Sequence, residues 1–246
     1  MAAEWLKIRK SVLIIISIIT PICINGLLAF DLHYRYFGYL VPHQSETGLS
    51  NWQLIFKEQT IFYFSELLPL FGALFLYELF AMEVKNNGWM LITTMPVKKS
   101  KTVLIKLFYS FLFMTVLLLF NIITIIIAGL ITGVEGPSEI ALFARVFFIQ
   151  WISMIGALPI ILLIMLVLEK IIYIIPVALL AGFVSGQLYY ADSESILSRI
   201  NPFTMASSCF RGNSSTIILT IIESTILCLF FSFLITYVIR KKELLR

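Results

Sequence analysis

The sequence predicts an all-α integral membrane protein with six transmembrane helices. Hydrophobic residues make up 60% of the 246 residues and charged residues only 13%, whereas about a quarter of the residues in a soluble domain are charged. A helix needs about 20 apolar residues to cross a bilayer, and runs of that length are too long for the strands of a membrane β-barrel. The predicted spans are residues 11–30, 59–82, 103–132, 141–168, 171–190 and 215–239.

The N-terminal part predicts a retained first span and an aromatic loop. Trp5, Leu6 and Ile8 lie beside basic residues, which indicates a short helix in the membrane interface. The apolar run that follows has no small-residue cleavage site, so we interpret it as a span and not as a signal peptide. Residues 31–58 then form the first outer loop, whose aromatic residues are typical of a belt that anchors a protein at the membrane boundary.

Lysine and arginine residues divide unevenly between the two sides that six spans define. The side with both termini carries three near the N-terminus, five within residues 83–106, Lys170 and four at the C-terminal end. The other side carries five of the total of 18. The positive-inside rule therefore places both termini in the cytoplasm. Because the basic residues are scattered along membrane edges, we expect no nucleic-acid partner.

Residues 83–106, between the second and third predicted spans, contain more than a connecting loop needs. Their middle reads as a short apolar helix that Pro96 ends, because proline lacks a backbone N–H and clashes with the preceding turn. An apolar face at the membrane surface predicts that a partner binds there. The candidate partner-binding residues are Glu83, Lys85, Gly88, Trp89, Met90, Leu91, Ile92 and Pro96.

This pattern resembles the cytoplasmic segment that follows the second span in ABC-2 type transporter permeases. The family tends to have a glutamate, a lysine and glycine pair, an apolar turn, a proline, a basic cluster and a lysine at the start of span three. These match Glu83, Lys85 with Gly88, Trp89 to Met95, Pro96, Lys98 with Lys99, and Lys106. The resemblance implies one ABC-2 type transmembrane domain over residues 1–246, with a coupling helix after span two and short re-entrant helices between spans five and six.

The resemblance also implies the function of a permease subunit in an ATP-driven exporter. No Walker A loop occurs, so the chain is not expected to bind ATP through a P-loop, and the resemblance implies a non-catalytic subunit that binds no cofactor of its own. ATP and Mg²⁺ would bind to two copies of a separate ABC ATPase chain, and a second permease subunit would complete a homodimer or heterodimer. Size, aromatic content and short outer loops look most like permeases for bacteriocin (lantibiotic) immunity and peptide-toxin export. The implied substrate is an amphipathic or hydrophobic peptide, and the implied location is a Gram-positive plasma membrane, where the transporter would confer antimicrobial-peptide resistance.

Two connections near the C-terminal half have distinct patterns. Only Glu169 and Lys170 separate spans four and five, which predicts a tight turn and a helical hairpin. Residues 191–214 are too short and too polar to span, and Pro202 divides them into two weakly apolar parts. Two short elements that dip into the outer leaflet would fit, as would a loop lying flat at the interface.

Three polar residues inside the predicted spans are candidates for lining a translocation cavity: Glu66, Asn121 and Glu223. Glu66 and Glu223 are each expected about 10–12 Å along their helices from the outer surface. A charge at depth usually faces a cavity or a partner, so the matched depth suggests one outward-opening cavity that attracts a cationic peptide. Alternatively, each glutamate is neutral or bonded to a neighbouring helix.

The sequence contains no recognisable catalytic or metal-binding constellation. His33, His43 and Asp31 lie within the predicted first outer loop without the spacing of a metal site, and no CxxC motif occurs. Two other function classes remain open. One is a small channel or secondary transporter, which would need a polar line through the membrane. The other is a membrane-anchored scaffold or sensor, for which residues 83–106 would serve only as a docking site.

Overall fold

The computed structural model confirms six helices that are long and apolar enough to cross a membrane. All of the regular secondary structure in the described part of the chain is helical. That part comprises residues 12–44, 48–85, 99–134, 136, 139–168, 170–192, 195, 198, 201–207 and 214–244.

The six long helices are α2 (Val12–Arg35), α5 (Phe64–Lys85), α7 (Lys99–Ile131), α8 (Ile140–Val167), α9 (Ile174–Ala191) and α12 (Ser214–Leu244). A π-helical turn, η1 (Tyr36–Leu40), continues α2. Shorter elements are α4 (Asn51–Gln59), the 3-10 turns η2 (Thr60–Phe62) and η3 (Ile171–Tyr173), and α11 (Pro202–Met205).

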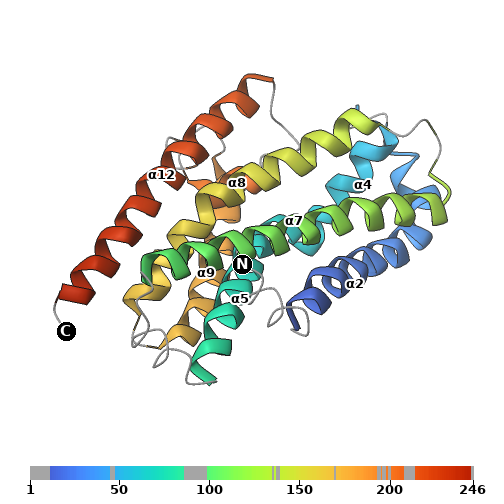
Figure 1. The fold of residues 1–246 in the computed structure, drawn as a ribbon. Helices are drawn as coiled ribbons and strands as arrows, with labels where there is room; N and C mark the ends of the chain where they lie inside the picture. Colours follow the sequence, from blue (N-terminus) through green and yellow to red (C-terminus); the bar gives the residue numbers. More distant parts are fainter. Residues whose placement is uncertain are drawn as a thin grey trace.

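The long helices form two packed layers (Figure 1). One layer contains α2, α7, α8 and α12 in that order, because α7 packs between α2 and α8, and α12 packs against α8. The second layer contains α5, which crosses both α7 and α8, and α9, which packs on α5. Since successive spans alternate in direction, α5 ends and α7 begins at one end of the bundle. We call this the basic end, after Lys85, Lys99 and Lys170.

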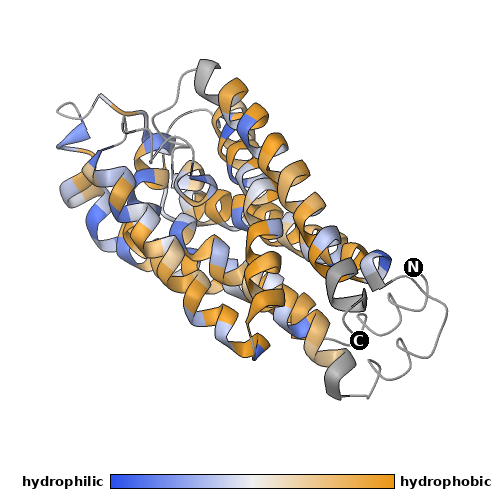
Figure 2. Cartoon of the chain, turned by 90° about the vertical axis from the view of Figure 1, so that its left-hand side faces the viewer, coloured by the Kyte–Doolittle hydropathy of each residue, from blue (hydrophilic) through white to orange (hydrophobic). Residues whose placement is uncertain are grey.

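Two hydrophobic cores hold the layers together. The larger core surrounds α5 and includes Leu68, Phe75 and Met114, all fully buried. The second core lies toward the opposite end of the bundle, where α4 packs among α2, α7 and α8 through residues such as Ile55 and Phe56. The outward faces of the long helices remain apolar, as Figure 2 shows, and Leu229 and Phe233 on α12 are about two-thirds exposed. Exposed apolar faces of this kind fit a helical bundle in lipid.

The structure corrects the interpretation of residues 31–58 as an outer aromatic loop. Helix α2 extends to Arg35, and α4 lies inside the bundle, with Trp52 3% exposed. The insertion is possible because Gly129 of α7 has no side chain: a Cβ there would lie 2.6 Å from the Trp52 ring. Only part of the predicted belt is exposed, as at Tyr34.

Two further expectations differ from the structure. Helix α5 begins at Phe64 and not at residue 59, because Tyr63 adopts a left-handed φ of 54°, which no α-helix can pass through. Helix α8 ends at Val167 and α9 begins at Ile174 after η3, yet α9 packs mainly on α5 and only slightly on α8, so these two spans do not form the expected packed hairpin. The close α5–α9 packing depends on Gly182 and Gly186, as described below.

Candidate functional site

In sequence, the predicted partner-binding stretch begins in the last turn of α5 and runs on toward the start of α7. Glu83 and Lys85 belong to the last turn of α5, and α7 begins at Lys99. The remaining predicted residues, Gly88, Trp89, Met90, Leu91, Ile92 and Pro96, lie outside the described residues. The structure therefore gives the two helices that carry this stretch, and both helices pack through the larger core.

The carboxyl group of Glu66 is enclosed by α5, α9 and the segment after α11. Glu66 is 1% exposed, and its Oε1 accepts hydrogen bonds from the hydroxyls of Tyr190 and Ser207, each at 3.2 Å. Its Oε2 is buried and has no hydrogen-bond partner among the described residues. Glu66 thus lies in a tight polar contact between helices, and an opening to it requires α9 or the α11 segment to move.

Two glycines of α9 make this close contact possible. A Cβ at Gly182 would lie 2.0 Å from the backbone oxygen of Glu66, and one at Gly186 would lie 2.5 Å from the Glu66 Cγ. Small residues four apart let helix backbones approach within a membrane, where lipid tails supply no hydrophobic force between helices. The α5–α9 crossing is therefore fixed at the position of Glu66.

A second polar cluster joins α2, α4 and α7 through side-chain amides. The Gln59 Nε2 donates to the Oδ1 atoms of both Asn25 and Asn121, at 2.8 Å each. The Asn25 Nδ2 donates to Asn121 Oδ1 at 2.9 Å and to Thr124 Oγ1 at 2.7 Å. Asn121 lies ten residues before the end of α7, which places the cluster about 15 Å along the helix from that end. Gln59, the last residue of α4, thereby ties that inserted helix to two spans.

The amide cluster leaves some donors without an acceptor. Asn121 is fully buried, and its Nδ2 has no hydrogen-bond partner among the residues that the structure describes. The Trp52 Nε1, buried against Gly129, also has no hydrogen-bond acceptor among the described residues. A buried donor without an acceptor costs about 1–3 kcal/mol. Both of these donors lie where α4 meets α7, so the hydrogen bonds between these two helices do not satisfy every buried donor at their contact.

An ion pair also joins α4 to α2, through Glu58, the residue before Gln59 of the amide cluster. Arg35 Nη1 donates to Glu58 Oε2 at 3.3 Å and to Asp31 Oδ2 at 3.0 Å. Glu58 is 7% exposed. Burial raises the pKa of the Glu58 carboxyl above its ordinary value of 4.5, and the guanidinium of Arg35 opposes this rise only in part. The folded chain therefore binds the Glu58 proton more tightly than the unfolded chain does.

The raised pKa of Glu58 predicts how stability changes with pH. The contribution of the Glu58 carboxyl to the free energy of unfolding is fully present below pH 4.5. It is lost as pH rises through the higher pKa of the folded state. We expect Glu58→Gln, which cannot ionise, to melt progressively higher than the wild type as pH rises from 4.5 to 7.5. Thermal melting in detergent at both pH values measures this difference. A difference that shrinks with pH would mean that the Arg35 pair outweighs burial.

The third cavity candidate, Glu223, lies on α12. It is half-buried on α12 beside Ser224, whose Cα lies 3.2 Å from where a Cβ on Gly156 of α8 would be. It is nine residues from the start of α12, about 14 Å, whereas Glu66 is two residues from the start of α5, about 3 Å. The matched depth inferred from the sequence therefore does not follow from the observed helix starts. The structure brings none of Glu66, Asn121 and Glu223 into a described hydrogen bond with another.

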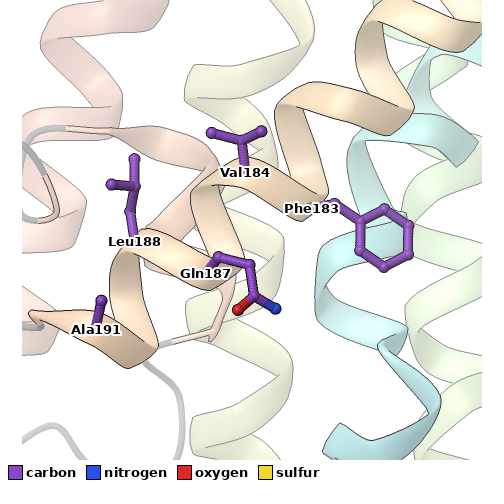
Figure 3. Close-up of a pocket in the computed structure, with 5 residues that line it drawn as sticks. All are labelled: Phe183, Val184, Gln187, Leu188 and Ala191. Atoms are coloured by element: carbon purple, nitrogen blue, oxygen red, sulfur yellow. The ribbon is translucent and has the colours of Figure 1, made fainter.

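One shallow apolar depression lies on the outward face of α9. Figure 3 shows its lining, in which Gln187 supplies the polar group. Phe183 points toward the α5 side, where its ring centroid lies 5.3 Å from that of Tyr63. Val184 is 56% exposed, as expected for a lipid-facing position. In the described part of the chain, no group of three His, Cys, Asp or Glu side chains could hold a metal ion.

Comparison with known families supports the transporter class. The profile of a family described as ABC-2 family transporter protein matches residues 1–186, three-quarters of the chain. The chain belongs to the ABC-2 transporter family. The ABC-2 assignment makes it a multi-pass membrane subunit of an ABC transporter and implies an ABC ATPase partner. No curated protein and no solved structure matches the chain significantly.

Sequence reasoning missed the two amides that join Asn121 in this ABC-2 chain. Asn25 lies inside the first apolar run, and Gln59 lies at the boundary that was assigned to the second span. A side-chain amide within an apolar run is itself a signal, because membrane-buried polar groups usually bond across helices. The sequence could not reveal their partner, since Asn25 and Asn121 are 96 residues apart.

Proposed function

We propose that this ABC-2 chain is the permease subunit of an ATP-driven exporter of amphipathic or hydrophobic peptides. Two permease subunits would form the path, and two copies of a separate ATPase chain would bind and hydrolyse ATP with Mg²⁺. The chain itself would be no enzyme and would bind no cofactor. The observation that carries the proposal is that α5 and α7, the two helices that residues 86–98 connect in sequence, pack together through the larger core.

The proposed coupling step follows from this connection. The ATPase would bind the apolar face of Trp89 to Ile92, with Glu83 and Lys85 setting its orientation. Helix α5 packs on α7, α8 and α9, so a displacement of its end at Lys85 would be passed to three other spans. Packed helices shift as bodies and do not deform continuously. Closure of the ATPases would thereby change the arrangement of the spans.

We further propose that the basic end lies in the cytoplasm, in a plasma membrane. On this orientation α11 would be re-entrant. It packs beside Gly156 of α8, and Met205 lies 3.7 Å from Ser224 of α12, two positions well inside candidate spans. A cavity opening from the outer side would expose Glu66 only if α9 or the α11 segment moved away from α5, with Asn121 and Glu223 lining other parts of the path.

The peptide substrate is supported by the resemblance to bacteriocin-immunity and peptide-toxin permeases and by the chemistry of the exposed faces. Leu180 and Val184 of α9 are more than half exposed, beside the polar Gln187. An amphipathic peptide removed from the bilayer would meet such mixed surfaces. The source would be a Gram-positive bacterium that resists or exports the peptide.

The coupling step predicts that Trp89→Ala/Leu91→Ala weakens binding to the ATPase. Buried aromatic anchors dominate interfaces of this kind, and the loss of about 1.4 kcal/mol lowers affinity tenfold. We therefore expect at least a roughly tenfold loss of the co-expressed ATPase on affinity purification. Stimulated ATP hydrolysis in proteoliposomes should fall with it.

A matched control for this variant is available on α12. Leu229→Ala/Phe233→Ala removes one leucine and one aromatic ring from positions that are 68% and 70% exposed, and it should leave ATPase binding unchanged. Normal ATPase binding and normal stimulation by the Trp89→Ala/Leu91→Ala protein would rule out this coupling segment. Failure of the wild-type chain to bind any ABC ATPase would favour a scaffold or sensor instead.

A further inference from the structure

Lys106 is buried at a position where a lysine normally reaches water. It is the eighth residue of α7 and lies about 10 Å along that helix from its start. Lysines near the end of a spanning helix usually extend their ammonium group to the interface. Lys106 is instead 2% exposed. An ionisable side chain held inside a spanning segment is a candidate for a functional role.

The ammonium group of Lys106 is directed at α5. Its Nζ donates a hydrogen bond to the backbone oxygen of Leu79 and lies 5.1 Å from the centroid of the Phe80 ring. Leu79 and Phe80 are each 2% exposed. A hydrogen bond and a cation–π contact therefore act on one atom, in surroundings of low dielectric constant that strengthen both.

The contact lies at a similar distance from the ends of both helices. Leu79 is six residues before the end of α5 at Lys85, and Lys106 is seven residues after the start of α7 at Lys99. Residues 86–98 connect those two ends. The Lys106–Leu79 contact thus closes a loop that contains the proposed ATPase-binding segment.

Packing alone does not account for a lysine at this position. Replacing a buried charge by an apolar side chain of similar volume is often neutral or stabilising, because the charge no longer has to leave water. The Leu79 oxygen lies within α5, where the helix offers it a backbone donor. What the ammonium adds is direction, since a hydrogen bond fixes how two helices are aligned whereas apolar contacts let them slide.

We propose that Lys106 is a positioning residue that fixes the alignment of α5 and α7 at the basic end. A displacement of residues 86–98 by the ATPase would then move both helices as one unit. The inference rests on the proposed function, because it assumes that an ATPase moves this segment. Without the contact, α5 and α7 would respond separately, and ATPase binding would persist while the stimulation of ATP hydrolysis was lost.

The test separates alignment from binding. Spin labels are placed on α5 and α7 through Met82→Cys and Ser100→Cys, with Cys23, Cys209 and Cys228 replaced by serine. Lys106→Met should broaden the distribution of distances between the two labels. It should also lower the stimulation of ATP hydrolysis at least about fivefold, the lower end of typical coupling between sites. It should leave ATPase co-purification and the melting temperature unchanged. Lys106→Arg, which keeps the charge, should restore both readouts.

Lys101→Met is the matched control, because Lys101 is exposed on the same helix, and it should leave both readouts unchanged. A Lys106→Met protein with wild-type label separation or wild-type stimulation overturns the inference. If that variant does not fold, Lys106→Leu removes the same hydrogen bond with a different apolar side chain, and unchanged stimulation then overturns the inference. If the wild-type chain binds no ATPase, the proposed function fails and the inference fails with it, and the label separation then shows whether the contact itself exists.

Discussion

Gly182→Ala is expected to destabilise the chain more than any other single methyl addition at a described glycine. The new Cβ would lie 2.0 Å from the backbone oxygen of Glu66, and a backbone atom cannot turn aside as a side chain does. Overpacking in a well-packed core costs about 1–3 kcal/mol and sometimes more. We expect about 3 kcal/mol here, which lowers the melting temperature by roughly 6–12 °C for a chain of this size.

Two other glycines provide graded controls for this experiment. Gly72→Ala would place its Cβ 2.8 Å from the Cδ2 of Leu158, a side-chain atom that can move, so a smaller loss is expected. Gly26→Ala, on α2, would meet nothing within 4 Å, and it should be neutral or stabilise by up to about 1 kcal/mol. Melting of the three variants in the same detergent gives the order. A Gly182→Ala protein with the same melting temperature as the Gly26→Ala protein would contradict the close α5–α9 contact.

Gln59→Leu is expected to release α4 from the spans that hold it. The change removes the two hydrogen bonds to Asn25 and Asn121 and leaves the Asn25 Oδ1 without that donor. Hydrogen bonds between membrane helices contribute about 0.6 kcal/mol on average, and an unsatisfied buried polar group costs about 1–3 kcal/mol. We therefore expect a loss of about 2–3 kcal/mol in the free energy of unfolding.

The matched control is Gln187→Leu, the same chemical change at an exposed position on α9, which should stay within about 0.5 kcal/mol of the wild type. A double-mutant cycle with Asn121→Leu should give a coupling of about 0.5–3 kcal/mol if the two side chains bond directly. Equal stability of Gln59→Leu and the wild type would mean that Trp52 and Phe56 hold α4 by packing alone.

Hydrophobicity determined the spans because a spanning helix is a local structure. All of the backbone hydrogen bonds of such a helix form within one segment, so about 20 apolar residues suffice to predict it. The predicted run 141–168 is accordingly close to the observed Ile140–Val167. The boundary at residue 59 was wrong because apolar character continues through Tyr63, where a single left-handed residue separates η2 from α5.

The candidate sites also divide into those that are local in sequence, which could be predicted, and those that depend on distant contacts, which could not. The pattern of residues 83–106, taken with six predicted spans and the length of the chain, predicted the ABC-2 family, because the motif is contiguous in sequence and each span is a local feature. The environments of Glu66 and Asn121 were not predictable, since their contacts come from residues far along the chain: Ser207 is 141 positions from Glu66, and Gln59 is 62 positions from Asn121. Buried polar residues were thus identified by type, and their partners were not.

The sequence by itself determined that this is a six-span ABC-2 membrane subunit, and the tertiary structure alone decided how its spans pack. The short connection at Lys170 predicted a hairpin of the fourth and fifth spans, whereas α9 makes little contact with α8. That α9 then packs on α5 follows from Gly182 meeting the backbone of Glu66, a match of surfaces more than 100 residues apart. Local periodicity records which face of a helix is apolar but not which partner covers it, because lipid and protein interiors are almost equally apolar.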